Sequence, residues 1–178
     1  LAKKLVDAAK EAGADAVKFQ TFKSENLVTK DASRAEYQKR NIGGEGSQLE
    51  MLKKLELNYN DFKLLKRYCD KKGIIFLSTP HTEDALDLLD SLVPAYKIGS
   101  GDLTNIPFLK KIAQKNKPMI LGTGMATMDE VKEALHVIYG EGNKEVVMLH
   151  CTTNYPCPKN EVNLRAMQTM QKELDCLV

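Results

Sequence analysis

The 178-residue chain has no tryptophan, and aromatic residues make up only 6% of it. Its four cysteines include no C-x-x-C pair, which predicts reduced thiols rather than a zinc ribbon or disulfide framework. No apolar run is long enough to span a bilayer, and no signal-peptide pattern opens the sequence. The 26 basic and 24 acidic residues are scattered, so neither a nucleic-acid-binding stripe nor a membrane-binding patch is expected. We therefore predict a soluble, cytoplasmic globular protein.

Helical and strand patterns alternate along the chain. The hydrophobic periodicity predicts helices over residues 1–13, 60–72, 83–92, 106–114, 128–139 and 164–174. Continuous apolar runs predict strands over residues 16–19, 74–77, 95–98, 119–121 and 146–149. Asn60 is expected to cap the second helix, and Gly13 and Gly73 to end the first two. Thr127 with Glu130 forms a capping box for the helix that follows.

Strands that are apolar throughout and separated by helices favour a parallel sheet covered by helices. Five such strands fit the middle of a (β/α)8 barrel better than a complete doubly wound sheet, so we expect roughly strands 2 to 6 of a TIM barrel. The Rossmann alternative would use Gly99-Ser100-Gly101 as its phosphate turn, but Thr104 stands where the third glycine belongs. The first residues lie inside a helical pattern and the last ones open a new apolar run, so we expect a piece of a longer chain.

Residues 23–48 break this regular alternation. They are polar, with glycine at positions 43, 44 and 46, and we interpret them as a long loop with a short helix near residues 32–40. Because the loop follows the carboxyl end of a strand, a substrate-covering role is expected.

Each predicted strand ends in a short polar cluster. The carboxyl ends of parallel strands open into one crevice, which is where barrel enzymes place their active sites. Two of the clusters contain a lysine, Lys18 and Lys97. A lysine at the end of a buried strand is costly unless it meets an anion, so a negatively charged substrate is expected.

The polar clusters and the strands before them form six strings, Gly13–Gln20, Phe76–Pro80, Ala95–Asp102, Gly122–Met125, Leu149–Thr152 and Tyr155-Pro156. In these strings the sequence resembles the sialic acid synthase family, the phosphoenolpyruvate-dependent enzymes that make N-acetylneuraminate, legionaminate and pseudaminate. The strings run in family order across nearly the whole chain. The segments Ala35–Gln38 and Gln48–Leu52 look more like the sialate and legionaminate branches than the pseudaminate branch.

The resemblance implies condensation of phosphoenolpyruvate with an open-chain 2-acetamido sugar such as N-acetylmannosamine, with phosphate released by C–O cleavage. It implies that the carboxylate and phosphate are bound by Lys18, Thr79, Lys97, Ser100 and Thr153, with Lys18 and Lys97 as the catalytic cations. It assigns the sugar hydroxyls to Gln20, Asp102 and Tyr155. Many relatives have serine where this chain has Gly122, so Thr123 or backbone N–H groups would have to compensate.

The resemblance also implies parts that lie outside this sequence. These are the first strand with a catalytic glutamate, the later strands with two metal-binding histidines, and an antifreeze-like C-terminal domain. A divalent ion, manganese or magnesium, would be held by those outside ligands, and a homodimer is expected. The 178 residues alone should then be inactive.

Several alternatives stay open from the residues themselves. Lys97 or Lys18 could serve as the amine of a Schiff-base aldolase, or the protein could be a sugar or phosphate sensor without chemistry. His150 is expected to be a satisfied core histidine. Cys151 and Cys157 bracket a polar turn, where a nucleophile or metal-ligand role is the less favoured interpretation.

Overall fold

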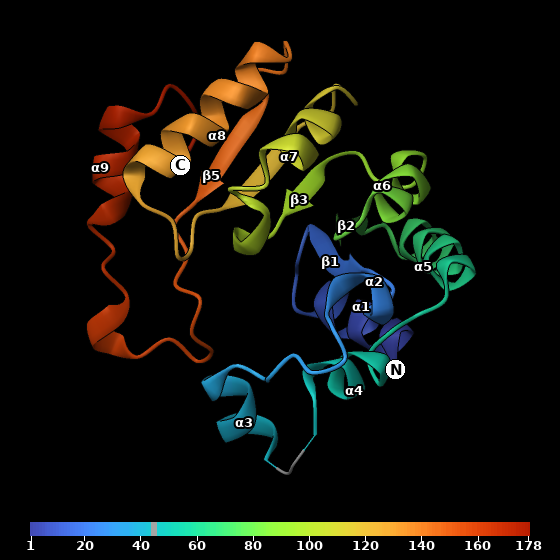
Figure 1. Ribbon diagram of the computed structural model, residues 1–178. Coiled ribbons are helices and arrows are strands. Elements are labelled where there is room, and N and C mark those ends of the chain that lie inside the picture. Colours follow the sequence, from blue (N-terminus) through green and yellow to red (C-terminus); the bar gives the residue numbers. More distant parts are fainter. Residues whose placement is uncertain (44–45) are drawn as a thin grey trace. The chain divides into compact units, whose positions relative to one another are not determined.

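The computed structural model describes residues 1–43 and 46–178 (Figure 1), so the predicted loop glycine at position 44 lies outside the described residues. The chain folds as two compact units. The first comprises residues 1–33 and 46–94, and the second comprises residues 34–43 and 95–178. No described helix is both long and apolar enough to cross a membrane.

The first unit is built on two parallel strands, β1 (Ala16–Thr21) and β2 (Ile75–Pro80). Helices α1 (Ala2–Glu11) and α5 (Tyr59–Lys72) pack on each other and on these strands, and α6 (Glu83–Asp90) packs on β2. Two short helices, α2 (Ser24–Leu27) and α4 (Gln48–Lys53), contact each other. Gly73 takes the left-handed conformation at the end of α5, as predicted.

The alternation of side chains along β1 and β2 separates a buried face from a second face. Phe19 and Phe76 stack with ring centroids 6.0 Å apart, and Phe62 and Leu65 of α5 are buried in the same unit. Thr21 and Ser78 are fully buried and share a hydrogen bond of 2.8 Å between their hydroxyls. Because residues alternate sides in a strand, Lys18 and Gln20 belong to the opposite face of β1.

The buried Thr21–Ser78 pair gives a stability prediction. In Thr21→Val the Ser78 hydroxyl would lose its partner, so we expect the free energy of unfolding to fall by about 1–3 kcal/mol. The double variant Thr21→Val/Ser78→Ala should lose clearly less than the sum of the two single variants, because no orphaned hydroxyl remains. Denaturant unfolding of protein expressed from the complete gene measures both, and strictly additive losses would contradict the coupling.

The second unit contains three parallel strands in chain order, β3 (Tyr96–Ile98), β4 (Met119–Gly122) and β5 (Val146–Leu149). Helices α7 (Ile106–Ala113) and α8 (Met128–Gly140) pack on each other beside this sheet (Figure 1). The remaining elements of the unit are α3 (Glu36–Ile42), α9 (Ala166–Glu173) and two 3-10 turns, η1 (Ser100–Asp102) and η2 (Lys159–Glu161). The capping box of Thr127 and Glu130 is present, as predicted.

The alternation of helices and parallel strands is confirmed, with corrections. Asn60 is not the N-cap, because α5 begins at Tyr59 and its N-cap position is Asn58, two residues before the predicted cap. Residues 23–48 are less loop-like than expected, since α2 lies within them and α4 begins at Gln48. The start of α4 is fixed by Ser47, whose hydroxyl accepts from the Glu50 N–H in a capping box. The described strands form two sheets where one had been expected, each with neighbouring strands consecutive in the chain.

Candidate functional site

The first unit places three of the predicted site residues on one face of its sheet. Lys18 is paired with Leu77 and Gln20 with Thr79 in the parallel register, so all four side chains project to the same side. Thr79 is buried, whereas Gln20 is exposed. This face therefore carries a cation, an amide and a hydroxyl near the carboxyl ends of β1 and β2.

Lys18 sits in partly desolvated surroundings. Its side chain as a whole is exposed to solvent, yet the protein around the ammonium partly desolvates it and lowers its pKa below the ordinary lysine value. No carboxylate is paired with it among the described residues. The charged form is thus disfavoured here unless an anion approaches it.

The second unit brings Lys97 close to Gly122 on adjacent strands. A methyl group on Gly122 would lie 2.8 Å from Ser100 Oγ, 3.5 Å from Lys97 Nζ and 3.4 Å from Cys151 Sγ. An ammonium, a hydroxyl and a thiol therefore converge on one point above the glycine. Lys97 Nζ also donates to the Ile98 carbonyl at 2.6 Å, which restricts where the ammonium can lie. The absence of a side chain at position 122 is what makes room for this convergence.

Gly124 and Thr153 extend the same cluster. The Gly124 N–H donates to Ser100 Oγ at 3.0 Å, which orients the serine and leaves its own proton available to an acceptor. A methyl group on Gly124 would lie 2.3 Å from Thr153 Oγ1 and 3.0 Å from Ser100 Oγ. Thr153 Oγ1 is buried and has no hydrogen-bond partner in the described part of the chain. A buried hydroxyl of this kind costs about 1–3 kcal/mol unless it is paired, so the cluster favours a bound polar group.

Thr123 and Asp102 are two further predicted residues, and Asp102 is not among the nearest neighbours of a methyl group on Gly122 or Gly124. The Thr123 hydroxyl donates to the Leu149 carbonyl at 2.9 Å, so its proton is not available to an anion. Asp102 lies at the end of η1 and is not the cap of the following helix, since Asn105 accepts from the Phe108 N–H. Thr123, predicted as a possible substitute for a serine at position 122, therefore has its hydroxyl proton bound to the backbone.

Tyr155 lies in the irregular segment after β5 and is 55% exposed. Its ring is tilted against that of Tyr37 on α3, with centroids 5.4 Å apart. Asn41, also on α3, donates to the Tyr155 carbonyl at 2.6 Å. The predicted sugar-binding tyrosine is therefore held by the helix that the sequence had suggested within residues 23–48.

The described residues offer no group of three or more His, Cys, Asp and Glu side chains that could hold a metal ion. His150 Nε2 is 2.7 Å from the Val162 carbonyl, so the histidine is hydrogen-bonded as predicted, but it is half-buried and does not belong to the core. All four cysteines are free thiols, and Cys151 contributes its sulfur to the cluster above Gly122. These residues do not fit a resident metal centre.

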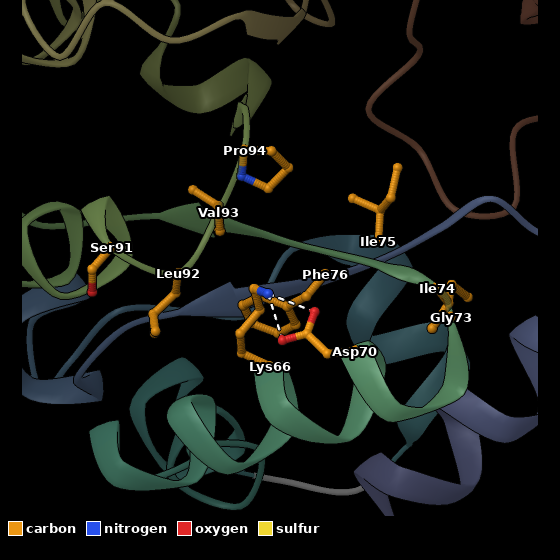
Figure 2. Close-up of a pocket in the computed structure, with 10 residues that line it drawn as sticks. All are labelled: Lys66, Asp70, Gly73, Ile74, Ile75, Phe76, Ser91, Leu92, Val93 and Pro94. Carbon is orange, nitrogen blue, oxygen red and sulfur yellow. Dashed lines mark hydrogen bonds and ion pairs between the residues drawn. The ribbon is translucent and has the colours of Figure 1, made fainter.

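A separate pocket lies at the opposite end of β2 (Figure 2). It is bounded by the amino end of β2, the last turns of α5 and the segment before β3, and its apolar lining includes Ile74, Phe76 and Val93. The Lys66 ammonium is bound there by both carboxylate oxygens of Asp70, at 2.5 and 2.7 Å. With its lysine already neutralised and none of the predicted site residues in it, this pocket is not the candidate anion site.

The sequence suggested Cys151 only as a less favoured nucleophile or metal ligand, and it gave no role to Gly124 or to the α3 residues Tyr37 and Asn41. The repeated glycine in Gly122-Thr123-Gly124 was the available signal for a close approach of side chains to the backbone. Nothing in the polar pattern of residues 34–43 indicated which strand end they would contact.

The chain is 49% identical over 178 residues to the N,N'-diacetyllegionaminic acid synthase of Legionella pneumophila and 48% identical over 174 residues to that of Campylobacter jejuni, covering 97% and 96% of the chain. It spans about half the length of these relatives, 50% and 52%. The crystal structure of an N-acetylneuraminic acid synthetase from Leptospira borgpetersenii in complex with citrate is similar over 99% of the chain and 57% of its own, with a TM-score of 0.83 and 29% identity.

The relatives named above are all synthases of sialic-acid-type sugars. Residues 5–178, nearly the whole chain, match the NeuB family. The order of the polar strand ends, the parallel sheets and these similarities agree, and the chain belongs to the NeuB family.

Proposed function

We propose that the protein condenses phosphoenolpyruvate with an open-chain 2-acetamido sugar and releases phosphate by C–O cleavage. The single observation that carries the proposal is the buried, unpartnered Thr153 hydroxyl, which lies with Ser100 around Gly124, while Ser100 and Lys97 lie together around the neighbouring Gly122. One cation and two hydroxyl donors, one of them oriented by the Gly124 N–H, suit the carboxylate and phosphate of a small trianion. The solved relative's complex with citrate, another small polyanion, supports the same chemistry.

In this proposal each group has a defined task. Lys97 and Ser100 stabilise the negative charge of the phosphoenolpyruvate, and Thr153 donates its free proton to the same anion. Lys18 and Thr79 serve the carboxylate and phosphate as well, while Gln20, Asp102 and Tyr155 bind the sugar, as the family resemblance implies. The Gly124 N–H holds the Ser100 oxygen before the substrate arrives, so little reorganisation is needed on binding.

The proposal includes the architecture around these residues. We infer that the two parallel sheets belong to one (β/α)8 barrel, of which the chain covers roughly strands 2 to 6. Neighbouring parallel strands in chain order, as in β3-β4-β5, are the arrangement that such a barrel repeats around its circumference. A homodimer and a cytoplasmic location remain part of the proposal on the family resemblance alone.

Phosphate release by protein expressed from the complete gene tests the function. Phosphoenolpyruvate should be consumed only with an acceptor, and the acceptors to compare are N-acetylmannosamine and a deoxy sugar with two acetamido groups, because the relatives at 48% and 49% identity are diacetyllegionaminic acid synthases. Phosphate release in the absence of any sugar, or none with any 2-acetamido sugar from a folded protein, would favour the sensor or the aldolase.

Metal removal is a separate prediction. We expect chelation to abolish phosphate release and added manganese or magnesium to restore it, with ligands outside the described residues, which contain no metal cluster. If the protein kept full activity after exhaustive chelation, with metal analysis showing that no divalent ion remained, the reaction would not need the ion.

The lowered pKa of Lys18 predicts a pH dependence. A lysine with a lowered pKa loses its charge at a lower pH than an ordinary one, so anion affinity is highest below that pKa and falls as pH rises through it. We expect kcat/KM for phosphoenolpyruvate to decline on the alkaline side over a scan from about pH 6 to about pH 10. Lys18→Arg should remove this decline at lower overall activity, because arginine stays charged. If kcat/KM of Lys18→Arg still declined at high pH as in the wild type, the decline would come from a group other than Lys18.

The same lowered pKa is the observation that keeps a Schiff-base aldolase as the second candidate. Desolvation makes a lysine amine more nucleophilic near neutral pH, and Lys18 has the desolvation. The Lys18 amine would then condense with the oxo acid and expel water, and borohydride would reduce the imine to a stable secondary amine, so the Lys18 peptide would gain the mass of the acid less one oxygen atom. If no adduct forms and phosphate release depends on the sugar, the aldolase is excluded and the synthase is supported.

A further inference from the structure

Helix α3 makes two independent contacts with Tyr155, and both come from one face of the helix. Asn41 donates to the Tyr155 carbonyl across 114 residues of sequence, and the Tyr37 ring packs against the Tyr155 ring. Residues 37 and 41 are four apart, so they are neighbours on the helix surface. Helix α3 therefore contacts both the backbone carbonyl and the side-chain ring of Tyr155.

Hydrogen bonds within the segment that contains α3 hold its two ends. Arg34 is 8% exposed, and its guanidinium donates to the carbonyl of Gly43 at 3.1 Å, joining the residue before the helix to the residue after it. At the start of the helix, Gln38 Oε1 accepts from the Ala35 N–H at 2.9 Å. A segment fixed at both ends in this way can act as a small rigid clamp.

The two tyrosines form an amphipathic surface. Neither phenol oxygen has a hydrogen-bond partner in the described part of the chain, and Tyr155 is more than half exposed. Aromatic faces and available hydroxyls suit an acetamido sugar, whose methyl and C–H groups pack on rings while its polar groups need donors and acceptors. No charged residue takes part in the Tyr37, Asn41 and Tyr155 contacts, in contrast to the lysine-containing cluster above Gly122.

We propose that α3 is the acceptor-specificity element of the protein, with Tyr37 and Asn41 as positioning residues that fix Tyr155 for the sugar. The inference rests on the proposed synthase function, in which Tyr155 binds the acceptor. It predicts that changes on α3 act on the sugar and leave phosphoenolpyruvate binding alone.

The test compares Tyr37→Ala, Tyr37→Phe and Asn41→Asp with Ile42→Ala, a control on the same helix whose side chain is 60% exposed. We expect Tyr37→Ala and Asn41→Asp to raise KM for the sugar by about tenfold, with kcat and KM for phosphoenolpyruvate within about twofold of wild type. Tyr37→Phe keeps the ring contact and Ile42→Ala leaves both contacts, so both should match wild type. An unchanged sugar KM, or an equal rise in both KM values, would overturn the proposal.

A second measurement separates this inference from the synthase activity. Amide hydrogen exchange over residues 151–158 should accelerate in Asn41→Asp and Tyr37→Ala but not in Ile42→Ala, whatever reaction the protein catalyses. If wild-type protein released no phosphate, the synthase would fail while the clamp could still be confirmed by exchange. Unchanged exchange in both variants would overturn the clamp even in an active enzyme.

Discussion

Replacing Lys97 with alanine is expected to lower kcat/KM for phosphoenolpyruvate by about 10²–10³-fold. The ammonium lies beside Ser100 Oγ above Gly122, in half-buried surroundings where a charge-assisted hydrogen bond is worth more than in water. Without it the bound anion would be partly desolvated and would lack that cation, which typically costs 2–5 kcal/mol. Initial rates of phosphate release at saturating sugar measure the effect.

Lys97→Arg is the companion variant, because it separates charge from nucleophilicity. Arginine keeps the positive charge but cannot form a Schiff base, so a synthase should retain more activity with arginine than with alanine. The retention will be partial, since the wider guanidinium meets Ser100 and Cys151 in the space that Gly122 leaves. Equal inactivation by both substitutions, in proteins with wild-type melting temperatures, would argue for an amine nucleophile.

The alternating elements could be predicted because their signals are local. Thr127 and Glu130 form the capping box of α8 within four residues. Gly73 ends α5 through its left-handed conformation. The strands overlap the continuous apolar runs of the sequence. The position of Asn60 shows the limit of such signals. Asn58 and Asn60 are the same residue type two positions apart, so a preference for asparagine at the N-cap does not distinguish them, and a helix boundary predicted from such a preference is uncertain by one or two residues.

The polar strand ends indicated where the candidate site lies, but which of their hydroxyls are available to a ligand could be told only from the three-dimensional contacts. Thr123 and Ser100 look equivalent in sequence, yet one hydroxyl is used by the Leu149 carbonyl and the other is oriented by a backbone N–H. The contact between Asn41 and Tyr155 joins residues 114 positions apart. Contacts at that separation follow from how the segments fold onto one another, and no local pattern encodes them.

Gly124→Ala is expected to reduce kcat/KM for phosphoenolpyruvate by about 10²-fold with little effect on global stability. The added methyl group would lie 2.3 Å from Thr153 Oγ1 and 3.0 Å from Ser100 Oγ, so at least one hydroxyl must move away from the cluster. Displacement of a substrate-positioning group by about 1 Å can cost this much. Gly140→Ala is the matched control, since a methyl group there meets nothing within 4 Å at the end of α8.

The cause of the Gly124 effect can be isolated with Thr153→Ala, which removes the oxygen that the new methyl group would meet. If the clash with Thr153 dominates, Gly124→Ala/Thr153→Ala should be no less active than Thr153→Ala alone, a strong departure from additivity. If displacement of Ser100 dominates, the double variant should be less active than either single one, because the 3.0 Å contact with Ser100 remains. Wild-type kinetics in Gly124→Ala would instead mean that neither hydroxyl binds the anion, and the cluster above Gly122 would lose its proposed role.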